Sequence, residues 1–319
     1  MAQEKILIIG SGGQIGVELA LALRENYGTQ NVIASDLKEA HPLLADGPYA
    51  ILDATNGEAI TALIKKEKVT QVYLLAAMLS ATGEKFPMKA WDVNMSSLLQ
   101  LLEIGVQEKL NKIYWPSSIA VFGPTTPREQ TPQATIVEPR TVYGISKYAG
   151  ELWCQYYQQR YGLDVRGLRY PGLISWKSLP GGGTTDYAVE IYHEALAKSH
   201  YTSFLSADTY LPMMYMDDAI RATIELMEAP AEKLRTRMGY NVSAMSFAPK
   251  EIAAAIKKHI PDFTIDYAPD FRQAIAIGWP KSIDDQAART DWGWKPEFDL
   301  PKMTETMLRE LRQQKSTPA

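Results

Sequence analysis

The sequence predicts an α/β protein with a doubly wound parallel sheet and a smaller, interleaved second lobe. Along the first 175 residues, short aliphatic runs alternate with longer segments in which apolar residues recur every three or four positions. Continuous aliphatic runs are typical of strands that are buried on both faces of a parallel sheet. A repeated strand–helix–strand order places helices on both faces of that sheet.

The runs and periodic segments define the predicted elements of this sheet. The strands are short and rich in Ile, Val, Leu or Tyr, and the helices between them carry the periodic apolar positions. We predict strands over Lys5–Ile9, Val32–Ser35, Tyr49–Leu52, Val72–Ala76, Lys112–Pro116 and Val165–Arg169, and helices over Ile15–Glu25, Gly57–Lys66, Lys89–Glu108 and Val142–Tyr161.

The alternation breaks after Pro171, where a glycine-rich stretch, Pro180–Thr185, precedes a helix near Asp186–Lys198. The segment Leu211–Leu226 and a short strand at Gly239–Val242 are expected to return to the sheet. We therefore predict a sheet domain over residues 1–172 with return segments near 207–247. The second lobe, an α+β unit expected to bind the substrate, is predicted over 173–206 and 248–319.

The composition excludes several classes of protein. With 46% hydrophobic and 22% charged residues, the 319-residue chain has the profile of a globular protein whose core needs no disulfide or metal. The 33 Lys and Arg against 37 Asp and Glu give a net charge of −4, which argues against general nucleic-acid binding. No run approaches the ~18 apolar residues of a membrane span, so we expect no membrane partner.

The single cysteine and the N-terminal residues favour a cytoplasmic location. Cys154 cannot form an intramolecular disulfide, which suits a reducing compartment, and we interpret it as a packed small hydrophobe. The first strand begins so early that no signal peptide precedes it. We predict no metal site, because the four histidines lack the spacing of metal ligands: His41, His193, His200 and His259.

A glycine pattern, Gly10-x-x-Gly13-x-x-Gly16, joins the first predicted strand to the first predicted helix. Gly10 permits the tight turn, the next glycines let backbone N–H groups approach a pyrophosphate, and Gly16 lets helix and strand pack closely. An ordinary glycine-rich turn is the alternative. The strand before, the helix after and an acidic residue 20 positions later favour a dinucleotide-binding Rossmann turn.

That acidic residue is Asp36, at the end of the second predicted strand. Its carboxylate is expected to accept hydrogen bonds from the adenosine ribose and to repel a 2′-phosphate, so we predict NAD rather than NADP as cofactor. Lys38 nearby is interpreted as a solvated turn residue. Asp53 is placed either to meet the adenine edge or to cap the next helix, a role that Asn56 can share.

Tyr143 and Lys147 are four residues apart and therefore share one face of a helix. Such a pair arises by chance in a chain of this length, so it carries little weight alone. Ser117 and Ser118 strengthen it, because they follow the fifth predicted strand, and ligands bind at the carboxyl ends of strands in open α/β sheets.

These motifs together resemble the extended short-chain dehydrogenase/reductases. The resemblance covers more than half of the chain and rests on Gly10–Gly16, Leu74–Ala77, Asn94, Pro116–Gly123, Tyr143–Lys147 and Arg169–Gly172, which fall in the family's order. Several segments are more similar still to the short-chain type of L-threonine 3-dehydrogenase: Leu79–Ala81, Pro139–Thr141, Gly183–Glu190 and Leu211–Met216.

The resemblance implies oxidation of L-threonine at its β-hydroxyl, with Tyr143 as general base, Lys147 favouring the phenolate, and Ser118, or Ser117 if the register is shifted by one, binding the substrate hydroxyl. It also implies a homodimer formed by the helices that carry Asn94 and Tyr143. The implied NAD contacts are Gly10, Gly13, Gln14, Ile15, Gly16, Asp36, Leu37, Asp53, Ala54, Leu75, Ala76, Ala77, Asn94, Pro116, Tyr143, Lys147, Tyr170 and Ile174. The implied substrate contacts are Ser80, Ser118, Tyr143, Thr185, Asp186 and Trp279.

Some of these residues have structural interpretations as well. Thr185 and Asp186 are suited to cap the helix that follows them, and Trp279 is suited to packing. Two other functions stay open from the sequence. One is a nucleotide-sugar epimerase or dehydratase of the same fold, and the other is a non-catalytic NAD sensor, although sensors typically lose the Tyr or the Lys.

Overall fold

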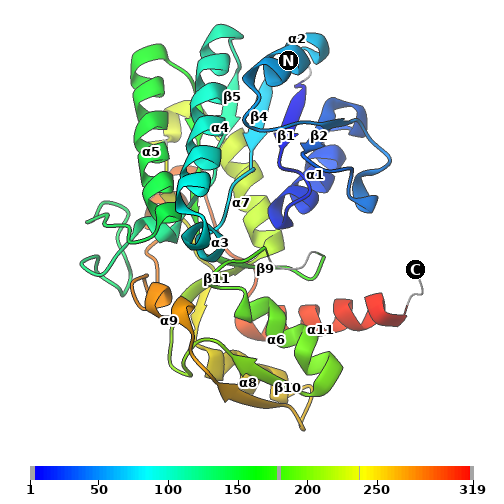
Figure 1. The fold of residues 1–319 in the computed structure, drawn as a ribbon, viewed down its shortest axis with the longest axis vertical. Coiled ribbons are helices and arrows are strands. Elements are labelled where there is room, and N and C mark those ends of the chain that lie inside the picture. The colour runs from blue at the N-terminus through cyan, green and yellow to red at the C-terminus, as the bar shows by residue number, and fades with distance from the viewer. Residues whose placement is uncertain (1–3, 178–180, 237, 317–319) are drawn as a thin grey trace.

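The computed structural model describes residues 4–316 except 178–180 and 237, and its centre is a six-stranded parallel sheet (Figure 1). The strand order is β3-β2-β1-β4-β5-β7, so the chain moves outward from β1 in one direction, returns, and then moves outward in the other. This reversal between β1 and β4 is the switch point at which open α/β sheets bind ligands. The strands are β1 (Ile6–Ile9), β2 (Val32–Asp36), β3 (Tyr49–Ile51), β4 (Gln71–Leu74), β5 (Lys112–Tyr114) and β7 (Val165–Arg166).

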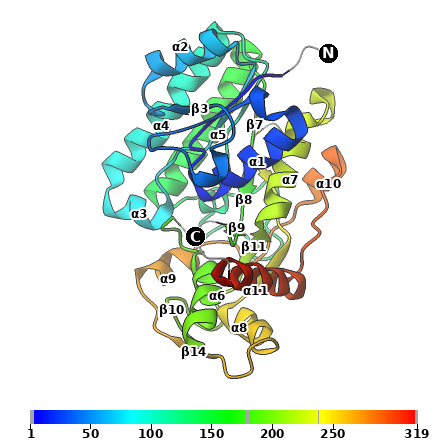
Figure 2. The same cartoon turned by 90° about the vertical axis from the view of Figure 1, so that its right-hand side faces the viewer.

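Helices cover both faces of this sheet, which confirms the predicted doubly wound class (Figures 1 and 2). Leu7 and Ile9 of β1 pack into one buried cluster with α2, α4 and α5, whereas Ile6 and Ile8 pack into another with α1 and α7. The alternation of these side chains follows from the two-residue period of a strand. The bounds are α1 (Gln14–Tyr27), α2 (Gly57–Glu67), α4 (Pro87–Gln107), α5 (Val142–Tyr161) and α7 (Met216–Glu228).

The single strand predicted over Val165–Arg169 is wrong at Gly167, where the structure has two strands, β7 and β8 (Leu168–Tyr170). A Cβ at Gly167 would lie 2.2 Å from the carbonyl oxygen of Trp115, so only glycine fits at this break. Strand β8 instead pairs with β6 (Ser117–Ser118) and with β12 (Tyr240–Asn241). The chain near residue 240 therefore returns to a separate three-stranded sheet, β12-β8-β6, and not to the six-stranded one.

Arg166 fastens β7 to the end of helix α7. Its side chain is 1% exposed, and its Nη1 donates to the carbonyls of Leu226, Met227 and Ala229. The last carbonyls of a helix have no intrahelical donors, and a cation is favoured at that end. The guanidinium therefore supplies hydrogen-bond donors to the free carbonyls at the C-terminal end of α7.

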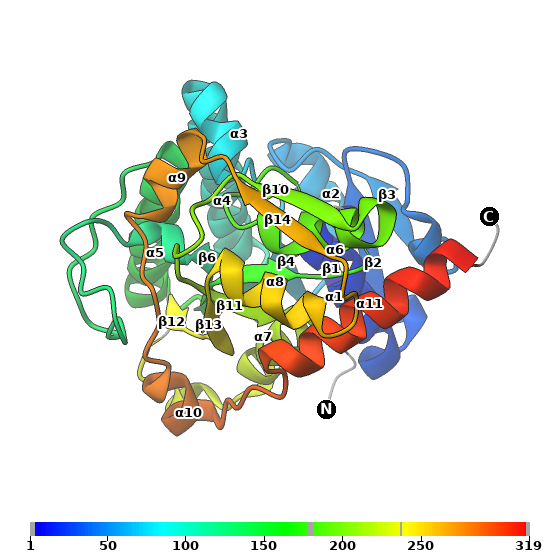
Figure 3. The same ribbon diagram turned by 90° about the horizontal axis from the view of Figure 1, so that it is seen from below.

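A second group of elements lies beneath the carboxyl ends of the sheet (Figures 1 and 3). Strand β9 pairs with β11, which pairs with β13, and β10 pairs with β14. Their buried side chains form a third apolar cluster with α6, α8 and α11. The bounds are β9 (Gly172–Ile174), β10 (His200–Ser203), β11 (Leu211–Tyr215), β13 (Met245–Phe247), β14 (Thr264–Tyr267), α3 (Ser80–Lys85), α6 (Tyr187–Lys198), α8 (Pro249–Lys257), α9 (Phe271–Ala276), α10 (Gln286–Trp292) and α11 (Leu300–Ser316).

The chain crosses between the two groups more than once. Helix α7 follows β11 without a break and packs on α1 of the sheet. Buried Asp218 on α7 accepts the N–H groups of Glu297 and Phe298, both at 3.0 Å, and so attaches the C-terminal segment. The division into a domain over 1–172 and a lobe over 173–206 and 248–319 stays a prediction. In the described part of the chain, no helix combines the length and the apolar character that a bilayer crossing needs.

Candidate active site

A cleft of about 520 Å³ opens at the switch point between β1 and β4 and contains most of the predicted site residues. Its walls come from both groups of elements: the glycine turn, the ends of β4 and β5, helix α5, and the segment that leads into α6. The predicted site residues that line it are Gly10, Gly13, Gln14, Ile15, Gly16, Ser80, Leu75, Ala77, Pro116, Ser117, Ser118, Tyr143, Lys147, Tyr170, Thr185, Asp186 and Trp279.

Two glycines of the turn are sterically required. Gly10 has φ +93°, and a Cβ there would lie 2.5 Å from the backbone nitrogen of Ala76. A Cβ at Gly16 would lie 2.4 Å from the carbonyl oxygen of Gly10. Ala76, predicted to contact the cofactor, therefore contacts the turn itself and does not line the cleft.

The same turn fits a dinucleotide. The first N–H groups of helix α1 have no intrahelical acceptors, and the N-terminal end of a helix favours a phosphate. The start of helix α1 meets the cleft at Gly13 and Gln14. The buried Nε2 of Gln14 has no hydrogen-bond partner within the protein. The residues present thus offer donors and space where a pyrophosphate would bind.

Asp36 ends strand β2, and its Oδ2 accepts the N–H of Gly12 at 2.9 Å. Leu37 beside it is 66% exposed. Neither Asp36 nor Leu37 forms a wall of the cleft in this structure. The carboxylate stands at the glycine turn, as the ribose-binding role requires.

The two roles considered for Asp53 can be compared with its contacts. The exposed Asp53 carboxylate accepts the N–H and hydroxyl of Thr55 at 2.8 and 2.7 Å, and these hydrogen bonds lower the pKa of Asp53. Asn56 caps helix α2 by accepting the N–H of Ala59. Asp53 is therefore not the cap of this helix. Ala54 is buried next to it, outside the cleft wall.

Two other predicted cofactor contacts lie behind the cleft. The side chain of Asn94 is held by both backbone groups of Met78 and donates to Ser146 at 3.2 Å. Ile174 is fully buried in the apolar cluster beneath the sheet, so its prediction as a lining residue is wrong for this structure. The strand alternation at β9 turns Leu173 toward the cleft instead.

Tyr143 and Lys147 lie one turn apart on α5, as predicted. The Lys147 Nζ donates to the Pro116 carbonyl at 2.6 Å and lies 4.3 Å from the centroid of the Trp115 ring. The hydroxyl of Ser118 accepts the N–H of Ala120 at 3.2 Å and lines the same cleft as the phenol of Tyr143, whose pKa it acts to lower. Helix α5 begins in register for this arrangement because Thr141 caps it by accepting the N–H of Gly144.

The two serines have different partners, although both line the cleft. Ser117 donates its hydroxyl to the buried carboxylate of Glu151 at 2.6 Å, whereas the Ser118 hydroxyl accepts the N–H of Ala120 at 3.2 Å. The role of Ser118 in binding the substrate stays a prediction.

Burial changes the protonation of the pair. Loss of solvent around Tyr143 raises the pKa of its phenol to about 12, which Ser118 only partly opposes. Burial also lowers the pKa of Lys147 to about 7, against the opposing effects of Cys154 and Glu151. Lys147, expected to favour the phenolate together with the positive nicotinamide ring, donates to Pro116 and lies 5.5 Å from the Tyr143 ring centroid, and this role stays a prediction.

The opposite wall carries the polar groups predicted to bind the substrate. The hydroxyl of Ser80 lies 3.1 Å from that of Thr184, a lining residue that the sequence reasoning passed over in favour of Thr185. The Asp186 carboxylate accepts the N–H groups of Gly182 and Gly183, and burial raises its pKa to about 6. Pro180, part of the predicted glycine-rich stretch, lies outside the described residues.

Trp279 closes one side of the cleft and is 6% exposed. Arg128, from the long segment between β6 and α5, donates its Nε to the Trp279 carbonyl at 3.2 Å. The described residues show no group of three or more His, Cys, Asp or Glu side chains that could hold a metal ion.

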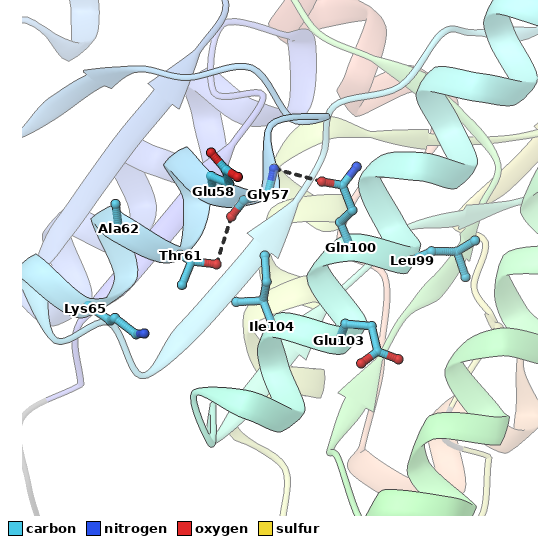
Figure 4. Close-up of a pocket in the computed structure, with 9 residues that line it drawn as sticks. All are labelled: Gly57, Glu58, Thr61, Ala62, Lys65, Leu99, Gln100, Glu103 and Ile104. Atoms are coloured by element: carbon cyan, nitrogen blue, oxygen red, sulfur yellow. Dashed lines mark hydrogen bonds between the residues drawn. The ribbon is translucent and has the colours of Figure 1, made fainter.

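A second hollow, of about 780 Å³, lies on the outer surface between α2 and α4 (Figure 4). Gln100 spans it by accepting the N–H of Gly57, and Thr61 donates to the carbonyl of the same glycine. None of its lining residues also lines the catalytic cleft. The hollow is lined by Thr61 and Lys65 but by no serine or tyrosine, so the predicted Ser–Tyr–Lys group is not there.

The glycine turn, the switch-point cleft and the Ser–Tyr–Lys group define a Rossmann-type, dinucleotide-dependent enzyme. The chain belongs to the NAD-dependent epimerase/dehydratase family, whose sequence pattern matches residues 6–243, and NAD is its cofactor.

The similar proteins span almost the whole chain. An uncharacterised epimerase/dehydratase from Staphylococcus haemolyticus is 52% identical over 313 residues, which cover 97% of this chain and 98% of that protein. A solved partial consensus L-threonine 3-dehydrogenase is 60% identical, with a TM-score of 0.95 over 97% of this chain and 99% of that chain. The holo form of a GalE-like L-threonine dehydrogenase from Cupriavidus necator is 58% identical, with a TM-score of 0.94 over 96% and 99%.

The lowered pKa of Lys147 predicts a pH-dependent stability. Between about pH 7.5 and 9.5 the unfolded chain keeps a proton on this lysine, whose usual pKa is 10.5, whereas the folded protein loses it. The free energy of unfolding of the wild type, minus that of Lys147→Met, is therefore expected to rise with pH by about 1.4 kcal/mol per unit. Urea unfolding at several pH values measures this difference. A difference that stays constant across the window would mean that Lys147 remains protonated in the fold.

Proposed function

We propose that this chain catalyses the NAD-dependent oxidation of the β-hydroxyl of L-threonine to 2-amino-3-oxobutyrate. The observation that carries the proposal is that Ser118, Tyr143 and buried Lys147 together line the switch-point cleft. The identity of 58–60% to two solved L-threonine dehydrogenases over nearly their full lengths supports the substrate.

Oxidation of a secondary alcohol removes a proton from oxygen and a hydride from the same carbon. NAD, when bound, supplies the carbon that accepts the hydride and a positive charge that favours the phenolate. Tyr143 accepts the hydroxyl proton at Oη, and Ser118 donates to the substrate oxygen and fixes its distance from Tyr143. Lys147, held by the Pro116 carbonyl, adds a cation behind the phenol when it is protonated.

The opposite wall supplies partners for an amino acid. The Asp186 carboxylate is positioned by two backbone N–H groups, and above its pKa of about 6 it can accept hydrogen bonds from the substrate ammonium. The hydroxyls of Ser80, Thr184 and Thr185 can donate to the substrate carboxylate. The product is a β-keto acid, which loses carbon dioxide readily.

The other two functions are less well supported. A nucleotide-sugar enzyme needs basic groups for the diphosphate of its substrate, and Lys147 is the only basic side chain among the described residues that line the cleft. A non-catalytic sensor has no need of the Ser–Tyr–Lys group in the cleft. We further propose a cytoplasmic location, because the buried thiol of Cys154 is unpaired.

Replacing the general base tests the mechanism. We expect Tyr143→Phe to lower kcat with L-threonine by about 10³-fold, because the proton acceptor is lost, and to leave the Kd for NAD nearly unchanged. Absorbance at 340 nm measures turnover. Tyr161→Phe is the matched control, because this phenol lies on the same helix and is 48% exposed to solvent, and it should keep wild-type activity. A Tyr143→Phe enzyme that retains a tenth of the wild-type kcat would refute the role.

Cofactor choice is tested at Asp36. We expect Asp36→Ala to weaken NAD binding roughly 10- to 100-fold, since hydrogen bonds to a charged group are lost. We also expect the variant to have a smaller difference in affinity between NAD and NADP than the wild type. Calorimetry with both cofactors measures this, with Asp46→Ala as an exposed carboxylate control. Wild-type protein that binds NADP as tightly as NAD would contradict the assignment.

We also propose a homodimer formed by the outer face of α4 and α5. Large apolar side chains are exposed there, and such patches are typical of interfaces: Met88, Trp91, Ile145, Leu152, Trp153 and Tyr156.

Sedimentation velocity tests the dimer. The wild type should sediment as a dimer at micromolar concentration, and Leu152→Glu as a monomer, because a charge would be buried without a partner. Ile136→Glu, at an exposed apolar residue outside this face, should remain dimeric. A monomeric wild type would exclude the interface.

A further inference from the structure

A buried ion pair lies directly behind the catalytic group. Glu151 on α5 is 1% exposed, and its two carboxylate oxygens accept Nε and Nη2 of Arg169 at 2.8 and 2.7 Å. Two parallel hydrogen bonds of this kind hold a carboxylate in one orientation. The pair is isolated from water, and its two-point contact makes it rigid. Removing either partner would leave the other charge buried without compensation.

The same carboxylate also holds the strand that carries the catalytic serine. Ser117 donates to Glu151 Oε1 at 2.6 Å, and Ser117 is the direct β-ladder partner of Arg169. The next register pair joins Ser118 to Tyr170. Glu151 therefore bonds to both members of one rung, adjacent to Ser118.

Arg169 extends this arrangement to two other segments. Its Nη1 donates to the Gln133 carbonyl at 3.3 Å and to Asn241 Oδ1 at 3.4 Å. Gln133 belongs to the long loop before α5, and its own amide donates to the carbonyl of Gly239. A Cβ at Gly239 would lie 2.6 Å from the Glu151 carboxylate, so β12 approaches the pair closely. The long loop is thereby fixed to the base of the site.

The pair also determines the charge around Lys147. Glu151 follows Lys147 by four residues and therefore lies on the same face of α5. Of the other groups near the ammonium, Trp115 and Pro116 are uncharged, and Tyr143 and Cys154 are held in their neutral forms because burial raises their pKa values. On α4, the neutral amide of Asn94 bonds to the Met78 backbone and to Ser146. Among the described residues, Glu151 is thus the acid near Lys147, in an ion pair with Arg169.

We propose that Glu151, held by Arg169, is a positioning residue of the active site, which fixes the rung beside Ser118 and favours the ammonium form of Lys147 by placing a negative charge one helical turn away. The inference rests on the proposed function only for its kinetic consequence, since the contacts and the protonation of Lys147 exist without any substrate. Glu151 acts through Ser117 and Lys147 and does not line the cleft.

A direct titration of Lys147 tests the electrostatic part. In protein labelled with ¹³C at the lysine ε-carbon, the Lys147 resonance is assigned by its loss in Lys147→Met. We expect its midpoint to fall by about one pH unit or more in Glu151→Gln, since an opposite charge close to a group shifts its pKa by this amount. Glu103→Gln is the matched control, because Glu103 accepts a hydrogen bond from Tyr157 of the same helix but is not one of the groups that act on Lys147, and its midpoint should equal that of the wild type. An unchanged midpoint in Glu151→Gln overturns the inference.

Turnover with L-threonine supplies the second readout. We expect Glu151→Gln to lower kcat roughly 10- to 100-fold at pH 8 with a small change in KM, because the base and its cation are affected and the substrate contacts are not. Glu151→Asp, which keeps the charge, should restore most of the wild-type Lys147 midpoint.

If Glu151→Gln does not fold, the double variant Glu151→Gln/Arg169→Gln removes both charges together, and it should still lower the Lys147 midpoint. If the wild type is inactive with L-threonine but Glu151→Gln shifts the Lys147 midpoint, the proposed substrate is refuted and the role of Glu151 is supported. If the wild type is active but the midpoint does not shift, the proposed substrate is supported and the role of Glu151 is refuted.

Discussion

The site depends on the burial of one ammonium group. Lys147 is 2% exposed, and its Nζ is held by the Pro116 carbonyl and the face of the Trp115 ring, both at the carboxyl end of β5. This contact fixes helix α5 against the sheet, and so places Tyr143, one turn earlier, in the same cleft as Ser118. The same burial sets the chemistry, because it holds the phenol protonated and makes the ammonium easier to deprotonate. In the proposed mechanism, the positive charge of NAD, when bound, would favour the phenolate.

The topology explains why the cleft combines two kinds of wall. The switch between β1 and β4 leaves a gap at the carboxyl ends of the strands, and the glycine turn occupies one side of it. Because β9 and β11 run beneath the sheet and lead into α6 and α7, polar residues such as Thr184 and Asp186 line the same cleft as Tyr143. Cofactor and substrate groups thus come from segments that are distant in the sequence but joined by one set of strands.

The sequence predicted those parts of the molecule that local patterns determine. The bounds of α5 and the six parallel strands follow from apolar periodicity and aliphatic runs, and the glycine turn follows from steric requirements at Gly10 and Gly16. It could not predict the break at Gly167, where the approach of Trp115 from a distant segment leaves room only for glycine. For the same reason it could not predict that the partner of Ser117 is Glu151 from another element. Ile174 was misplaced because the register of β9 depends on its pairing with β11.

The central claim is that this site oxidises L-threonine with NAD, and the most direct measurement is a substrate panel with product identification. Purified protein is incubated with NAD and L-threonine, D-threonine, L-serine or a UDP-hexose, while NADH is followed at 340 nm and products are identified by mass spectrometry. We predict NADH formation with L-threonine, in a one-to-one ratio with 2-amino-3-oxobutyrate and its decarboxylation product, aminoacetone. Conversion of the UDP-hexose to its epimer or dehydration product, without net NADH from L-threonine, would contradict the account.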